Sequence, residues 1–161
     1  KSADFDAGVN LVKQVLARSG EINTEYVLGH IYRHGIGVKE DKAKGAEYWR
    51  LSANAGDVTA QVFYGDLLLR GDSVPVNMEL AEHYFELALS QRHLAGAIGI
   101  GFVAHSLHRD DAKAAAYLAF GSTGQQPEAE ELCRNIVQQM NEDELEQAWK
   151  IRRSLEARFS N

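Results

Sequence analysis

The sequence predicts an all-α fold in which helical hairpins stack one after another as a solenoid, and a recurring spacing of 36 residues is the main reason. Gly29, Gly65 and Gly101 are each separated by 36 residues. Five further pairs keep the same spacing and a matching residue type: Val38 and Val74, Asp41 and Asn77, Tyr48 and Tyr84, Trp49 and Phe85, and Leu51 and Leu87. Self-similarity at a fixed period is typical of repeat proteins, in which each unit buries its apolar face against the next.

Each repeat divides into two helical stretches joined by a turn. In the first copy, apolar residues recur at helical spacing from Val27 to Tyr32, and Gly35 then interrupts the pattern. A glycine can take the left-handed backbone conformation that ends a helix. Asp41, and Asn77 one repeat later, can accept hydrogen bonds from the free N–H groups at the start of the following helix. The repeating unit is therefore predicted to be a helical hairpin.

Glycines also lie inside the predicted helices, where they serve packing rather than nucleotide binding. Gly29 and Gly65 lie midway along the first helix of their repeats, so a partner helix can approach closely there. The cluster of Gly96, Gly99 and Gly101 has no preceding strand, which a dinucleotide-binding loop requires. We therefore expect close helix packing at these positions as well.

The two ends of the sequence extend the repeat pattern. Residues 6 to 19 are predicted to be the second helix of a partial repeat. The last helix should begin at Asn141, where Glu144 can complete a capping box. We expect Trp149 to be largely buried against the helix that contains Cys133. The residues expected to cover the open end of the stack are Leu145, Trp149, Leu155 and Phe159.

This pattern predicts one domain over residues 1–161. It consists of a partial repeat at 6–24, repeats at 25–57, 58–93 and 94–125, and a terminal hairpin with a cap at 126–161. Because the sequence begins mid-pattern at Lys1, we expect a fragment of a longer protein.

Composition excludes several classes of function. The chain has 23 acidic and 17 basic residues, a formal net charge of −6, and its basic residues are spread along the sequence. A nucleic-acid-binding protein needs a basic face instead. No apolar run approaches the roughly 20 residues of a membrane-spanning helix. Cys133 is the only cysteine, so it cannot form an intrachain disulfide, and we expect it to be a buried apolar residue.

The first hairpin carries a specific motif. It reads Leu28-Gly29-x-x-Tyr32-x-x-Gly35-x-Gly37-Val38-x-x-Asp41, followed by Tyr48-Trp49-x-x-Ser52-Ala53-x-x-Gly56-Asp57. This motif resembles the Sel-one-like repeat (SLR) family, which is related to the tetratricopeptide repeats. The second copy departs from it where Ser73 replaces Gly37 and Arg92 replaces Gly56. The third copy lacks the glycine turn altogether.

The resemblance implies a right-handed α-α superhelix with a C-terminal capping helix, used as an adaptor or scaffold for other proteins. Many members of the family are bacterial, and several lie in the cell envelope. The resemblance implies no reaction and no cofactor. We therefore expect a non-enzymatic protein that binds a protein or peptide, without nucleic acid as a partner and without direct membrane insertion.

The predicted binding site is a concave groove formed by the first helices of the repeats. Its candidate residues are Tyr26, His30, Arg33, His34, Asp66, Leu69, Arg70, Phe102 and His105. Several outward positions are apolar or aromatic beside arginine, which is the composition of an interaction surface. An equally open alternative is that Val62, Ile98 and Phe102 are buried between adjacent repeats.

A second functional hypothesis concerns His30, His34 and Asp66. The rival to the adaptor is a bacterial envelope protein that binds polysaccharide or peptidoglycan, or a hydrolase, and these residues would form its site. His30 and His34 share one helix face, but two imidazoles fall short of the three or four ligands of a zinc site. The sequence shows no nucleophile with a base fixed beside it. We therefore predict no metal site and no catalytic residues.

Overall fold

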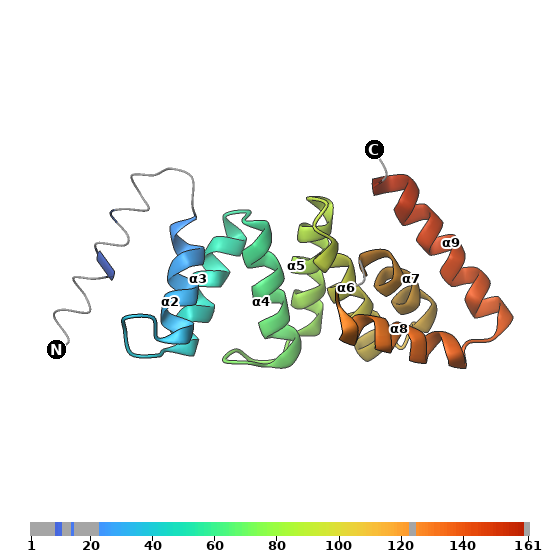
Figure 1. The fold of residues 1–161 in the computed structure, drawn as a ribbon, viewed down its shortest axis with the longest axis horizontal. Helices are drawn as coiled ribbons and strands as arrows, with labels where there is room; N and C mark the ends of the chain where they lie inside the picture. Colours follow the sequence, from blue (N-terminus) through green and yellow to red (C-terminus); the bar gives the residue numbers. More distant parts are fainter. Residues whose placement is uncertain (1–8, 11–13, 15–22, 123–124, 160–161) are drawn as a thin grey trace. The chain divides into compact units, whose positions relative to one another are not determined.

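The computed structural model describes residues 9–10, 14, 23–122 and 125–159, and within these ranges it is helical with no strand. Its helices are α2 (Thr24–His34), α3 (Lys42–Asn54), α4 (Val58–Arg70), α5 (Met78–Ser90), α6 (Leu94–Val103), the π-helical turn η1 (Ala104–His108), α7 (Asp111–Gly121), α8 (Pro127–Gln139) and α9 (Glu142–Phe159) (Figure 1). The all-α prediction is confirmed. Most of the predicted helix at 6–19 lies outside the described residues.

The chain folds into two compact units, residues 1–76 and 77–161. In the first unit α3 packs against both α2 and α4. In the second, α6 packs against α5 and α7, and α7 packs against α8 and α9. The organisation of residues 1–161 as one domain stays a prediction.

Side-chain caps begin the helices where the sequence predicts them. Asp41 Oδ1 accepts a hydrogen bond from Lys44 N at 2.9 Å, and Asn77 Oδ1 accepts one from Leu80 N at 2.9 Å. Each cap satisfies an N–H group that has no partner inside its helix. Residues that are 36 positions apart thus cap equivalent helices, as the repeat predicts.

The left-handed turn residues also follow the 36-residue register. Gly35 ends α2 with φ 64°, and Gly71 ends α4 with φ 70°. Ser73 has φ 68° and Arg92 has φ 65°, although both stand where the first copy has glycine. The backbone conformation of the repeat is therefore retained at positions where the glycine itself is lost.

Replacing Arg92 with glycine should raise the stability of the protein. A non-glycine residue in the left-handed region costs about 1–2 kcal/mol, and part of that gain is offset because glycine loosens the unfolded chain. We expect Arg92→Gly to increase the free energy of unfolding by about 1 kcal/mol in urea titrations. Gln91→Gly is the control, because Gln91 has φ −88° and should gain nothing.

The first unit is built on close contact between α2 and α3. Trp49 of α3 is only 2% exposed, and a Cβ atom added to Gly29 of α2 would lie 2.1 Å from its Cδ1 atom. The indole Nε1 of Trp49 donates a hydrogen bond to the carbonyl oxygen of Tyr26 at 3.2 Å. The predicted role of Gly29 in close helix packing is confirmed.

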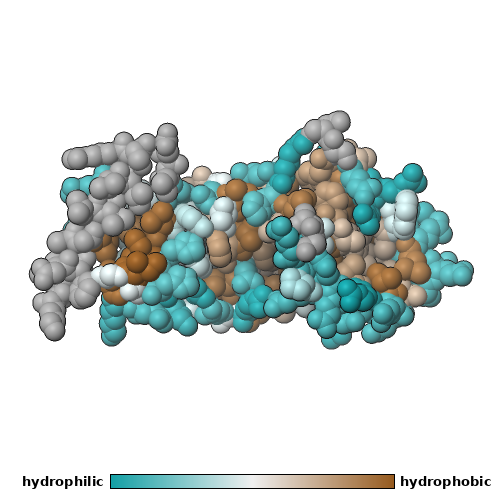
Figure 2. Space-filling model, in the orientation of Figure 1, coloured by the Kyte–Doolittle hydropathy of each residue, from teal (hydrophilic) through white to brown (hydrophobic). Residues whose placement is uncertain are grey.

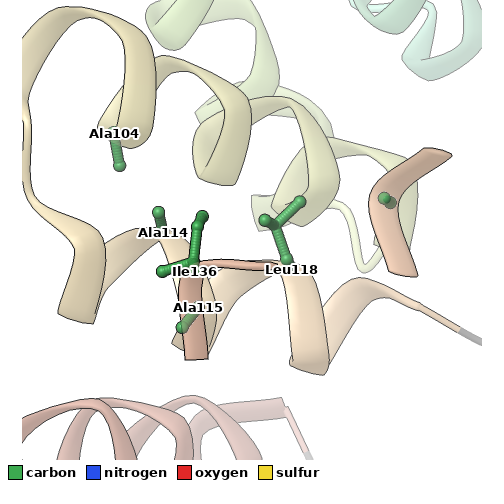
Figure 3. Packing of buried hydrophobic residues seen from close by; sticks show 6 residues of the cluster. Ala104, Ala114, Ala115, Leu118 and Ile136 are labelled. Atoms are coloured by element: carbon green, nitrogen blue, oxygen red, sulfur yellow. The ribbon is translucent and has the colours of Figure 1, made fainter. Parts of the chain in front are cut away.

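The core of the second unit joins α7 to its neighbours (Figure 3). The buried residues of this cluster are Ala104, Ala114, Ala115, Leu118, Ala129 and Ile136. A Cβ atom at Gly101 of α6 would lie 2.6 Å from Leu118 Cγ, so α6 and α7 also meet at a glycine. Cys133 is half-buried beside the cluster, and its thiol donates to the carbonyl oxygen of Ala115 at 3.6 Å. Burial raises the pKa of this thiol.

Helix α9 packs against α7, but through a different side of α9 from the one that the sequence predicts. Asn141 and Glu144 form the predicted capping box, with hydrogen bonds of 2.8 and 3.0 Å. Leu155 is 5% exposed, and the Phe159 ring centroid lies 5.8 Å from that of Phe120. The prediction that Trp149 is buried is wrong, because its side chain is 64% exposed.

The helical period explains this correction. Ala148, which packs against the core cluster, shares a face with Leu155 and Phe159, since the three follow one another by seven and four residues. Trp149 is the next residue after Ala148 and therefore points about 100° away around the helix. Leu145, four residues before Trp149, is also exposed, so the same correction applies to it.

Candidate functional site

An aromatic cluster surrounds His30 in the first unit. The His30 ring centroid lies 4.8 Å from Tyr26, 5.8 Å from His34, 4.9 Å from Trp49 and 5.3 Å from Phe63. Three of the predicted site residues on α2 are thus brought together. Phe63 of α4 completes the cluster. The sequence did not reveal Phe63 as a site residue, because its neighbour Val62 is the position predicted to face outward on this helix.

His30 is held in its neutral form by this packing. Its Nε2 atom is buried and has no hydrogen-bond partner. Burial is the main cause that lowers the pKa of His30 below its ordinary value of 6.5, and the charges of His34 and Arg33 lower it further. His30 therefore serves as an aromatic packing residue at neutral pH.

Acidification should weaken the protein through His30. Because the pKa of His30 is lower in the folded state than in the unfolded chain, the stabilising contribution is present above about pH 6.5 and is lost as the pH falls below it. We expect the free energy of unfolding to decrease between about pH 7.5 and pH 5. His30→Leu should make this decrease shallower in chemical denaturation measured over the same range. An equally steep decrease in that variant would contradict the assignment.

Arg33 is committed to contacts within the first unit. Its guanidinium forms an ion pair with Asp72, in the loop after α4, and lies 5.4 Å from the Trp49 ring centroid. Asp72 accepts hydrogen bonds from Ser73 and Arg33, and these bonds, the one from Ser73 first, lower the pKa of its carboxyl group. The Arg33 side chain is only 13% exposed. Arg33 thus links α2 to the second repeat, so replacing it should lower the free energy of unfolding.

Asp66 and Arg70 form an exposed pair on α4. Arg70 Nε donates to Asp66 Oδ1 at 2.7 Å, one helical turn away. Leu69 beside them is half-buried, and His34 at the end of α2 is exposed. Asp66 is therefore engaged with Arg70 rather than joined to the two histidines. Across the described ranges, no set of three or more His, Cys, Asp or Glu side chains is placed to hold a metal ion.

The site residues of the second unit are partly structural. Phe102 packs against the core cluster together with Ile98, and both side chains are half-buried, so part of Phe102 stays exposed. His105 Nδ1 lies 2.7 Å from Asp111 Oδ1. The sequence analysis did not anticipate a neighbouring network, in which Glu82 binds both His108 Nε2 at 2.9 Å and Lys113 Nζ at 2.8 Å.

In the part of the chain that the structure describes, every helix is too short or too polar to cross a lipid bilayer. On the face shown in Figure 2, apolar patches interrupt a largely hydrophilic surface.

Comparison with known proteins identifies the repeat. The family model of the Sel1 repeat matches residues 23–57 and 58–93. Protein sel-1 homolog 2 of Homo sapiens is 31% identical over 71 residues, which are 44% of this chain and 10% of that protein. The Mus musculus protein is 32% identical over 74 residues, covering 45% of this chain and 11% of its own length. The chain thus spans about a tenth of these relatives.

Two solved structures share the fold. One is c5321, described as a protective antigen present in uropathogenic Escherichia coli strains and displaying an SLR fold. It matches with a TM-score of 0.76 and 22% identity over 94% of this chain and 33% of its own. A Sel1 repeat protein from Oxalobacter formigenes matches with a TM-score of 0.62 and 25% identity over 76% of this chain and 37% of its own. Residues 23–93 therefore contain two Sel1 repeats, and the chain has the SLR fold, which generally mediates protein–protein interaction and is typically a non-catalytic scaffold.

Proposed function

We propose that this protein is a non-enzymatic adaptor that binds a partner protein or peptide in a groove formed by the first helices of its repeats. The observation that carries the proposal is the aromatic cluster around His30 on α2, with exposed polar residues beside it. Aromatic side chains and arginine are the residues that most often dominate binding energy at protein interfaces. A rigid helical face also lowers the entropy lost on binding.

In the first unit we assign direct contact to Tyr26, His34, Leu69 and Arg70. His34 and Arg70 are exposed, while Tyr26 and Leu69 are half-buried and offer apolar surface. His30 and Arg33 support this face from beneath, because both are packed against Trp49. Asp66 sets the position of the Arg70 guanidinium through their hydrogen bond.

In the second unit we assign contact to Phe102 and His105. Both side chains are partly exposed on consecutive turns of α6 and η1. The π-helical turn η1 lies where the third repeat lost its glycine turn, and such turns often occur at functional positions.

An arginine on the binding face would favour a partner segment that mixes acidic and apolar residues, since guanidinium groups bind carboxylates in a bidentate manner.

The proposal is tested by the double variant Leu69→Ala/Arg70→Ala. We expect it to weaken binding of a captured partner by about 2 kcal/mol, or roughly thirtyfold, as truncation of interface hot spots does. Arg33 is left unchanged because of its structural ion pair. The matched control is Arg50→Ala/Glu86→Ala on α3 and α5, the second helices. Titration calorimetry in which the control loses affinity and the double variant keeps it would contradict the proposed face.

A further inference from the structure

One side of α9 faces away from the core of the second unit and carries two apolar side chains followed by an arginine. Leu145, Trp149 and Arg153 follow one another at four-residue intervals and therefore share one side of the helix. Leu145 is 38% and Trp149 64% exposed, and the Arg153 guanidinium lies 5.2 Å from the Trp149 ring centroid. The shallow hollow on this side is lined by Leu145, Glu146, Trp149, Lys150 and Arg153. We call these five residues the α9 face.

Charge along α9 divides sharply into two halves. Residues 142–147 contain four acidic residues and no basic one, for a charge of −4. Residues 148–159 contain four basic residues and one acidic one, for a charge of +3. Trp149 lies where the two halves meet. A helix with this distribution is complementary to a second copy of itself that runs in the opposite direction.

We infer that the α9 face is a self-association surface, on which a second copy of this chain docks with its α9 antiparallel. In a two-fold dimer the same patch serves both partners, so every contact occurs twice. Pairing centred between Trp149 and Lys150 places Glu146 of each copy opposite Arg153 of the other. The two indoles then lie near the two-fold axis, each flanked by Leu145.

The energetics favour this arrangement over a parallel one. Burying two tryptophans removes a large apolar area from water. Antiparallel packing also opposes the two helix dipoles, whereas a parallel pair would bring the acidic halves together. Glu146 pairs with Lys150 of its own helix at 2.8 Å, and both side chains are about two-thirds or more exposed. Such exposed pairs contribute little, so Glu146 can bind a second partner.

Sedimentation equilibrium over a concentration series tests the inference. We expect the unmodified chain to show a monomer–dimer equilibrium. Glu146→Arg alone and Arg153→Glu alone should each weaken dimerisation by on the order of tenfold or more, since each symmetric dimer exchanges two attractive contacts for two repulsive ones. Trp149→Ala should weaken it as well.

Mixing the two charge variants gives the decisive result. One copy then carries arginine at both positions and the other carries a carboxylate at both, so an antiparallel heterodimer regains two ion pairs. We expect mixing to restore dimerisation at least to the level of the unmodified chain. Arg134→Glu, at an exposed position of α8, reverses a charge elsewhere and should leave the dimer unchanged. Far-ultraviolet circular dichroism should show that all variants stay folded.

Three outcomes would overturn the inference. The unmodified chain remains monomeric at every concentration, which means that the α9 face does not mediate self-association. The dimer persists in both single variants, which means that it uses another surface. The mixed variants fail to associate, which excludes the antiparallel pairing.

Discussion

Gly29→Ala should destabilise the first unit by about 1–3 kcal/mol, the usual range for overpacking a tight core. The added Cβ atom would lie 2.1 Å from Trp49 Cδ1 and 2.3 Å from Nε1, far inside van der Waals contact. Trp49 cannot retreat easily, because it is 2% exposed and its Nε1 is bonded to the Tyr26 carbonyl. Urea denaturation monitored by circular dichroism measures the loss.

A second variant isolates the cause. In a Trp49→Ala background the collision is absent, and Gly29→Ala should then stabilise the helix by up to about 1 kcal/mol, because alanine has the higher helix propensity. The sign of the effect is therefore expected to reverse between the two backgrounds. Ala43→Val, at an exposed position of α3, should cost only about 0.5 kcal/mol. Destabilisation of equal size in both backgrounds would show that the contact with Trp49 is not responsible.

Removing residues 141–161 should cause aggregation or loss of cooperative unfolding. The truncation exposes the side of α7 that α9 covers, and repeat proteins need a capping element over their last apolar face. Analytical ultracentrifugation and thermal unfolding measure both effects. A truncated chain that remains monomeric and equally stable would contradict the capping role.

Point substitutions separate the two faces of this cap. Leu155→Ala should lower the free energy of unfolding by about 2–4 kcal/mol, since Leu155 is 5% exposed. Trp149→Ala should change it by no more than about 0.5 kcal/mol in dilute solution, where the chain is monomeric. The reverse ranking would support the prediction from the sequence that Trp149 is one of the residues that cover the core.

The repeat and its local structure could be predicted because they depend on short-range chemistry. A cap such as Asp41 acts on residues three positions away, and a glycine such as Gly35 ends its own helix. The 36-residue spacing then transfers each assignment from one copy to the next. The Asp66–Arg70 pair could be anticipated for the same reason, since it spans one helical turn.

The remaining features depend on contacts that no local pattern contains. Arg33 pairs with Asp72, 39 residues away, so the sequence shows only an arginine on a helix. Helix α9 carries apolar residues on two faces, and periodicity alone does not say which face meets the core. The sequence predicts that Trp149 and Leu155 both cover the core, whereas the fold buries Leu155 and leaves Trp149 exposed.

Site-specific photo-cross-linking tests the proposed binding face most directly. A photoreactive residue would be placed at His34 or Arg70 on the first helices, and at Arg50 or Glu86 on the second helices, and each chain would be irradiated with its captured partner. The account predicts cross-links to the partner from His34 and Arg70 and none from Arg50 or Glu86. Cross-links that form only from Arg50 and Glu86 would contradict it and would place the partner on the second helices.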